Sequence, residues 1–178
     1  MSIWQHHSDD EKIVMLQQTA AARKIIEQAV EKDWWVSTVL MALSTTSWAG
    51  FLQFKGGTSL SKSWGLINRF SEDIDMSVSR SFFGLNDDTP QQRTAIRRKA
   101  FHYIEKNLIG EIDKALNLCG IEGYEIQLVT KNSSAMVTTL ELKYQTILTT
   151  IIEDILPVIK VESHSLIHSF THLLKTEN

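Results

Sequence analysis

The 178-residue chain contains a single cysteine and only two prolines. One cysteine, Cys119, excludes an intrachain disulfide, and no Cys/His spacing of a zinc site surrounds it, so we expect a buried structural thiol. No apolar run approaches the roughly 20 residues that span a bilayer. Residues 1–12 lack the basic and then apolar stretch of a secretory signal. These absences predict a cytoplasmic protein with no membrane partner.

The sequence also lacks an excess of basic residues. Its 18 lysines and arginines are outnumbered by 21 aspartates and glutamates, which gives a net charge of −3. A nucleic-acid partner would therefore need a local basic patch. The segment 90–118 offers one in Arg93, Arg97, Arg98 and Lys99, although basic residues on a long helix are commonly only a solvated face.

No repeat, low-complexity tract or Pro/Gly-rich linker divides the chain, so we expect residues 1–178 to form one domain. Periodic apolar residues predict helices over residues 9–30, 33–43 and 90–118. Alternating patterns predict strands over residues 50–55, 73–78, 125–130, 137–147 and 157–162. This order indicates an α+β fold with about five strands.

The segment Lys55-Gly56-Gly57-Thr58-Ser59 joins a predicted strand to a predicted helical turn. Adjacent glycines let the backbone approach a ligand closely, and the unpaired N–H groups at the start of a helix suit a phosphate. Thr58 and Ser59 add hydroxyl donors. The spacing is that of neither a Walker loop nor a dinucleotide fingerprint, and a Gly-Gly pair at such a place is more often only a tight turn.

Asp73 and Asp75 follow in the next predicted strand. Residues two apart in a strand share one face, so both carboxylates converge while Ile74 faces the core. Two such carboxylates repel unless they share a cation, and hard oxygen ligands suit Mg²⁺ or Mn²⁺. An isolated Asp-x-Asp is often a solvated edge strand. Its place shortly after a glycine turn favours the metal site of a phosphoryl-transfer enzyme.

A two-metal site usually needs a third carboxylate, and Glu162 in the last predicted strand is the candidate. Lys160 is two residues away and shares its face. Glu141 in the preceding strand is the alternative ligand, and an exposed charge at a strand end is the alternative role for Glu162.

Three motifs in order resemble the AbiEii toxin family of nucleotidyltransferases: residues 31–36, 54–62 and 70–75. Residues 157–162 resemble a later family segment. The resemblance implies a DNA polymerase β-like nucleotidyltransferase fold, with a mixed sheet flanked by helices, and it implies bound Mg²⁺ and a nucleoside triphosphate (NTP). Family members are typically the toxin half of type IV toxin–antitoxin or abortive-infection systems, so a cognate antitoxin is an expected partner.

Relatives transfer nucleotides to the 3′ acceptor end of tRNA, and others are described mainly as GTP binders. The resemblance therefore implies NTP and RNA as partners of this chain. It assigns catalysis and metal binding to Asp73 and Asp75, and we expect Glu162 to complete this set as the third carboxylate. It assigns phosphate contacts to Gly56, Gly57, Thr58 and Ser59 of the glycine turn. Lys62 and Arg69 are candidates for second-tier phosphate contacts, with a solvated basic residue as the alternative for each, and Lys160 is expected to contact the nucleotide from the face of Glu162.

Residues 31–33 and the C-terminal region of the chain have no role that the family motifs assign. The run Glu31-Lys32-Asp33 matches the family, but physically it suggests only helix-junction capping and packing against tryptophans. Family members usually continue into a helical C-terminal region that is expected to be short or missing here. A non-catalytic NTP- or antitoxin-binding module, and nucleotide transfer to a protein, are therefore alternative functions. Three late histidines recur every fourth residue, which favours one face of a partly exposed helix over the alternative of a metal site: His164, His168 and His172.

Overall fold

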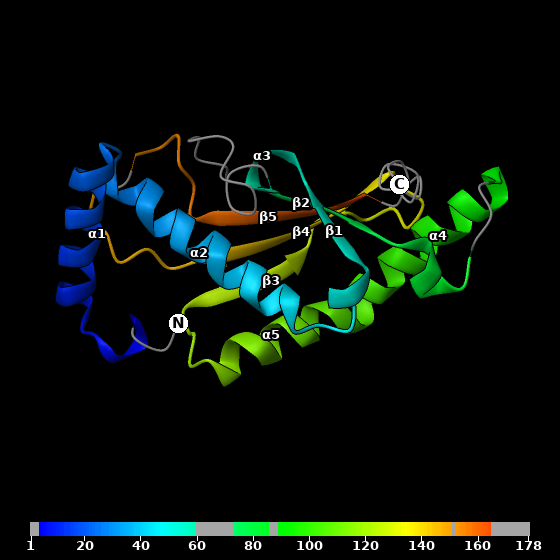
Figure 1. Ribbon diagram of the computed structural model, residues 1–178, viewed down its shortest axis with the longest axis horizontal. Coiled ribbons are helices and arrows are strands. Elements are labelled where there is room, and N and C mark those ends of the chain that lie inside the picture. Colours follow the sequence, from blue (N-terminus) through cyan, green and yellow to red (C-terminus); the bar gives the residue numbers. More distant parts are fainter. Residues whose placement is uncertain (1–3, 60–72, 86–88, 151, 165–178) are drawn as a thin grey trace, which may run out of the picture.

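The computed structural model describes residues 4–59, 73–85, 89–150 and 152–164. Its strands form a single sheet in the spatial order β1-β2-β5-β4-β3 (Figure 1). The pair β2–β5 is parallel and the other neighbouring pairs are antiparallel. The strands are β1 Leu52–Lys55, β2 Asp73–Val78, β3 Tyr124–Leu128, β4 Val137–Tyr144 and β5 Val158–His164. The expected α+β fold with a mixed five-stranded sheet and flanking helices is confirmed.

The helices are α1 Asp9–Arg23, α2 Glu27–Ser44, α3 Gly56–Thr58, α4 Pro90–Tyr103 and α5 Ile109–Leu118. A π-helical segment, Ile104–Leu108, joins α4 to α5, so the long helix predicted over residues 90–118 is confirmed. Thr89 caps its start by accepting a hydrogen bond from the backbone N–H of Gln92, and Pro90 occupies the first turn. None of the helices in these described ranges is long and apolar enough to cross a bilayer.

The first helix ends earlier than the apolar pattern predicts. Lys24 adopts a left-handed conformation with φ 56°, and its N–H donates to the carbonyls of Ala20 and Ala21. This geometry ends α1, and α2 begins at Glu27. The expectation that Glu31 lies at a helix junction is therefore wrong, because Glu31 lies within α2.

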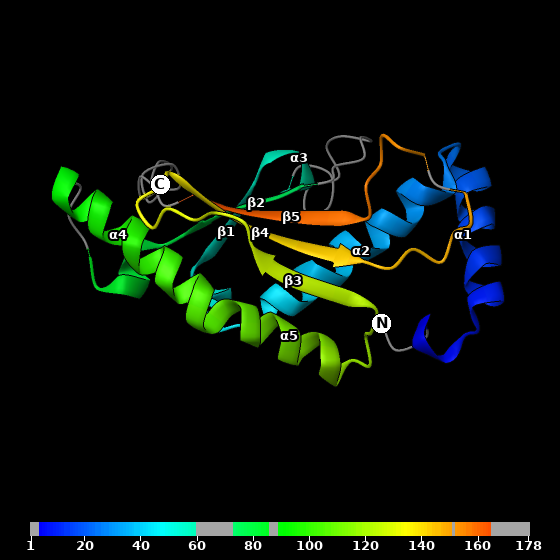
Figure 2. The same ribbon diagram turned by 180° about the vertical axis from the view of Figure 1, so that it is seen from behind.

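One face of the sheet packs against α2 and the α4–α5 helix (Figures 1 and 2). Ile74 and Met76 of β2, with Ile159 and Val161 of β5, are fully buried there, as expected for Ile74. The helices complete this core with Val36, Val39, Leu43, Ile104, Leu108, Ile112 and Leu116. Each such burial contributes roughly 1.5–3 kcal/mol. Because every second residue of β2 and β5 is buried against the helices, the residues between them face the opposite side of the sheet.

Cys119 corrects another expectation, because its side chain is exposed rather than buried. It follows directly after α5, where its own N–H caps the helix by donating to the carbonyls of Leu116 and Asn117. The buried face of α5 is supplied by Ile112 and Leu116. A residue after the last turn lies outside that apolar stripe.

Candidate active site

The polar face of the sheet carries the predicted site residues in adjacent rows. Asp75 of β2 is the register partner of Lys55 on β1 and of Glu162 on β5. One row away, Asp73 is the partner of Lys160. The register therefore sets a carboxylate beside a lysine in one row, and two carboxylates beside each other in the next.

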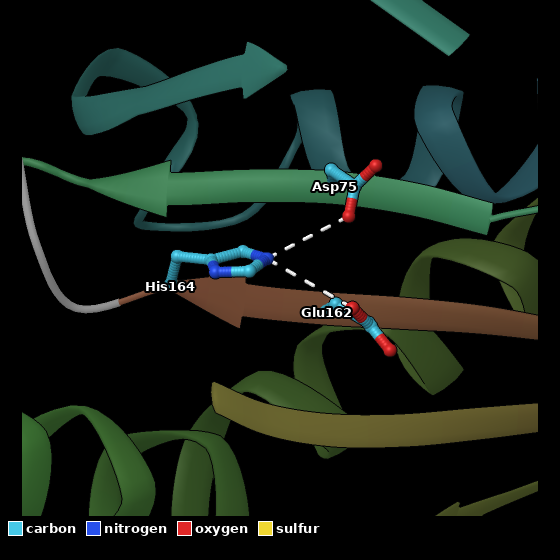
Figure 3. Close-up of side chains that lie close together, drawn as sticks. All are labelled: Asp75, Glu162 and His164. Carbon is cyan, nitrogen blue, oxygen red and sulfur yellow. Dashed lines mark ion pairs between the residues drawn. The ribbon is translucent and has the colours of Figure 1, made fainter. Parts of the chain in front are cut away.

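Asp75 and Glu162 converge on a third side chain, His164 at the end of β5 (Figure 3). The Nε2 atom of His164 lies 3.6 Å from Oδ1 of Asp75 and 3.8 Å from Oε2 of Glu162. One potential ligand atom from each of the three residues lies within 4.8 Å of the other two. All three side chains are half-buried, so their donor atoms remain accessible from the polar face.

This cluster meets the chemical requirements of a divalent cation. Like charges on neighbouring strands destabilise a sheet, and Asp75 and Glu162 are such a pair. A cation shared between the carboxylates removes that repulsion. Two carboxylate oxygens and an imidazole nitrogen are ligands that Mn²⁺ and related ions accept, and the carboxylates alone suit Mg²⁺. The donor set therefore fits the metal that the sequence predicts.

The glycine turn lies directly against this cluster. Gly56 has φ +67°, a conformation that side chains disfavour, and a Cβ built on it would lie 2.2 Å from Oδ2 of Asp75. Only glycine fits at that position without moving the carboxylate. The turn is continued by the single helical turn α3, in which the Ser59 N–H donates to the Gly56 carbonyl. The backbone after β1 therefore lies in contact with the Asp75 carboxylate.

The remaining predicted residues divide into three sets. Asp73 is exposed and does not belong to the cluster of Asp75, Glu162 and His164, although it shares the polar face of β2. Lys160 is exposed beside it in the neighbouring strand. Gly57 and Ser59 continue the glycine turn, and for Thr58 the backbone alone is described. Lys62 and Arg69 lie outside the described residues.

Glu141, the alternative third carboxylate, lies in a different row from Glu162. It is the register partner of Lys160, and its Oε2 accepts a hydrogen bond from Nε2 of Gln127 at 3.1 Å. Among the described acidic residues, Glu162 is the one that joins Asp75 in the three-residue cluster.

The prediction that His164 lies on a helix is wrong, because His164 is the last residue of strand β5. His168 and His172 lie outside the described part of the chain. The signal that sequence reasoning missed was the two-residue alternation of β5. Ile159, Val161 and Ser163 are buried, and the alternate residues Lys160, Glu162 and His164 face the other side.

Glu31 fixes the chain segment that leads into β5. Its side chain is buried, and its carboxylate accepts hydrogen bonds from the Thr146 hydroxyl at 2.6 Å and the Ile147 N–H at 2.9 Å. Gln28, one turn earlier, accepts from the Ile152 N–H at 2.8 Å and donates to the Ile155 carbonyl. Both side chains therefore anchor the connection between β4 and β5 to α2.

Burial raises the pKa of Glu31 above its ordinary value of 4.5, and the hydrogen bonds from Thr146 and Ile147 partly oppose that rise. Desolvation is the larger effect, and it raises the pKa because it penalises the charged carboxylate. The family-like run that contains Glu31 thus has a structural role in the described residues, at the connection that precedes Glu162.

A basic surface lies on α4 and the π-helical segment that follows it, and its residues do not belong to this cluster. A groove with a volume of 390 Å³ is lined by Arg98, Lys99, His102 and Lys106 together with Phe82, Phe83, Tyr103 and Asn107. Lys99 donates from Nζ to the Phe83 carbonyl at 3.2 Å. Arg98 is exposed, and Arg93 and Arg97 are half-buried. The predicted basic group therefore includes both solvent-facing and packed side chains.

A comparison with protein families agrees with the sequence motifs. Residues 38–170 match the family model described as nucleotidyl transferase AbiEii toxin, type IV toxin–antitoxin system. No curated protein matches the chain significantly. Among solved structures, the chain is similar to MenT4, a nucleotidyltransferase toxin from Mycobacterium tuberculosis H37Rv, at 22% sequence identity and a TM-score of 0.45. That match covers 85% of this chain and 42% of MenT4, so the chain spans less than half the length of MenT4.

Proposed function

Since the chain belongs to the AbiEii family of nucleotidyltransferase toxins, we propose that it transfers a nucleotide from an NTP to an RNA acceptor, the 3′ end of tRNA. Family membership gives the class of transferase, and the acceptor and the metal dependence are what this proposal adds to it. Such a transfer blocks aminoacylation and so stops translation, which accounts for toxicity. A cognate antitoxin and a cytoplasmic location, where tRNA is found, belong to the same proposal.

The contact between the glycine turn and Asp75 carries the proposal. A backbone that can approach a triphosphate lies against the Asp75 carboxylate, and Glu162 lies beside Asp75 on the parallel strand. Phosphate-binding and cation-binding groups are thereby adjacent, as transfer from a metal-bound triphosphate requires. A simple tight turn would not need this contact with a carboxylate.

Asp75 and Glu162, with Asp73 on the same face of β2, would hold the divalent cation, Mg²⁺ or Mn²⁺. When bound, such a cation lowers the pKa of an attacking hydroxyl and neutralises triphosphate charge. The backbone of residues 56–59 binds the phosphates. Lys55, the exposed register partner of Asp75, adds positive charge there, and Lys160 adds it beside Asp73.

In the reaction, the 3′-hydroxyl oxygen of the RNA attacks the α-phosphorus of the NTP. A new phosphodiester bond forms, the bond from the α-phosphorus to its bridging oxygen breaks, and pyrophosphate leaves with that electron pair. The hydroxyl proton passes to solvent. The protein residues align the two reactants and balance their charge, which is most of what phosphoryl transfer requires of an enzyme.

The basic surface formed by α4 and the π-helical segment supports an RNA acceptor. Arg98, Lys99 and Lys106 bring positive charge together on a protein whose net charge is −3. Local basic residues bind phosphate backbones with little regard to sequence, and that binding weakens as salt rises. We therefore assign contacts with the RNA phosphate backbone to this surface.

The test is a labelling assay with the full chain, Mg²⁺ or Mn²⁺, each of four α-labelled NTPs, total cellular RNA and lysate protein. We expect label on tRNA and its loss in Asp75→Asn and Asp73→Ala. Glu125→Gln, which changes an exposed carboxylate of β3, serves as the matched control. Label that persists in Asp75→Asn would refute the site. Label found on protein instead of RNA would refute the acceptor and retain the chemistry.

A further inference from the structure

His164 gives the carboxylate cluster a nitrogen donor that the sequence motifs do not include. Its Nε2 atom is the ring atom that approaches both Asp75 and Glu162, at 3.6 and 3.8 Å (Figure 3). These distances leave the three donor atoms close enough to surround one ion. The ring comes from the same strand as Glu162 and from the same face, so β5 supplies two of the three groups.

The chemistry of this donor set differs from that of an all-carboxylate site. Mg²⁺ favours oxygen ligands and keeps much of its water, whereas imidazole nitrogen is well suited to the later divalent ions of the first transition row. Replacing one oxygen ligand by imidazole therefore lowers the relative preference of a site for Mg²⁺. Mn²⁺ accepts both kinds of donor and still supports phosphoryl transfer.

A second observation concerns Ser77 of β2, which lies in the same row of the sheet as His164. Ser77 is the register partner of His164 and is fully buried, and its hydroxyl has no hydrogen-bond partner within the described ranges. Buried hydroxyls without a partner are uncommon and call for an explanation. Histidines that bind metals normally engage their other ring nitrogen in a hydrogen bond that fixes the ring. Ser77 carries a hydroxyl of the required kind in the row of His164, although it makes no hydrogen bond to the ring in this structure.

We propose that His164 is a metal ligand of this site, binding through Nε2 alongside Asp75 and Glu162, and that it makes the site prefer Mn²⁺ to Mg²⁺. The proposal rests on the metal site of the proposed function and adds to it a nitrogen ligand and the preferred ion. His164 thereby takes the third position in the cluster, while Asp73 remains one row away beside Lys160.

The test uses the tag-free full chain with substoichiometric Mn²⁺ and no NTP, observed by electron paramagnetic resonance. Imidazole bound directly to Mn²⁺ imposes a nitrogen modulation on the electron spin echo, which oxygen ligands do not. We expect this modulation in the wild-type protein and its absence in His164→Gln. We also expect Mn²⁺ affinity to fall by about tenfold or more, since even changes outside the ligand shell cost that much. The affinity for Mg²⁺ should change less.

His102→Gln is the matched control, because His102 is an exposed histidine of α4 that contacts Glu105 and does not belong to the cluster. It should retain both the modulation and the affinity. His164→Asn provides a second variant, and circular dichroism confirms that each variant is folded. If both His164 variants misfold, the wild-type modulation is compared with that of Asp75→Asn, which should weaken the same Mn²⁺ site.

Two results would overturn the inference, and they differ in what they imply for the proposed function. Mn²⁺ that depends on Asp75 but shows no nitrogen modulation would leave His164 as an ion-pair partner of the carboxylates and would keep the proposed catalytic site. Mn²⁺ binding that Asp75→Asn does not change would place the ion elsewhere and remove the metal site from both proposals.

Discussion

Gly56 and Asp75 are in such close contact that a single added carbon atom on Gly56 would lie 2.2 Å from the Asp75 Oδ2 atom. The contact joins the turn after β1 to the middle of β2, two strands that pair with Lys55 opposite Asp75. It links the two sequence motifs of the site in space. Substitutions that change either the glycine turn or the Asp75 carboxylate, and leave the other unchanged, therefore test the site.

Gly56→Ala should disrupt the site more than it disrupts the fold. Gly56 and Gly84 share φ +67°, but a Cβ on Gly84 meets no atom of the described residues within 4 Å. Both alanine variants should lose about 1–2 kcal/mol from left-handed strain, measured by urea unfolding. Only Gly56→Ala should also lose nucleotide transfer, because Asp75 must move. Equal transfer by the two variants would contradict the assigned contact.

Glu162→Gln and Glu141→Gln distinguish the two candidates for the third carboxylate. Glu162 lies in the Asp75 cluster, whereas Glu141 is engaged with Gln127. Changes to groups that only support a metal ligand typically weaken metal binding by roughly 10- to 100-fold. We expect Glu162→Gln, which changes a ligand itself, to weaken Mn²⁺ binding by at least that much. Calorimetric titration measures that affinity. Glu141→Gln should bind as the wild type does, and the reverse order would reassign the ligand.

The pH dependence of stability should carry the signature of Glu31. Burial raises the folded-state pKa of this carboxyl above 4.5, so the folded protein holds the proton more tightly than the unfolded chain. That contribution to stability is fully present below pH 4.5 and is lost as pH rises through the folded-state pKa. Glu31→Gln removes it.

The free energy of unfolding of the wild type, relative to Glu31→Gln, should therefore decrease as pH rises across this window. Urea unfolding of both proteins over a pH series measures the difference. Glu125→Gln changes an exposed carboxylate and is the control. A difference that increases with pH would show that the hydrogen bonds from Thr146 and Ile147, which favour the charged form, outweigh burial.

Cys119 should react with a thiol reagent in the folded protein. Its side chain is exposed after the end of α5, so reaction requires no unfolding. We expect one thiol per chain to be modified at a rate that stabilising conditions do not slow. Cys119→Ser should leave the free energy of unfolding within about 0.5 kcal/mol of the wild type. Reaction only in denaturant would contradict the exposed placement.

Local patterns predicted most of the elements correctly. β2 occupies the predicted residues 73–78, and the continuous helix over 90–118 is present because its apolar residues recur at helical spacing. β4 ends at Tyr144 instead of continuing to residue 147. The backbone of Ile147 bonds to Glu31 on a distant helix, and an alternating pattern cannot reveal such a contact. Tertiary bonding overrode the strand pattern there.

The amino-acid sequence by itself determined that Asp73 and Asp75 share one face of a strand, because that follows from the two-residue period. Tertiary structure decided which groups lie beside them. Glu162 and His164 reach Asp75 only through the register of the parallel pair β2–β5. That register is set where Ile74, Met76 and their partners on β5 bury their side chains against the helices, since a shift by one residue would turn the apolar set outward. The burial of the opposite face thus selected the residues that form the cluster.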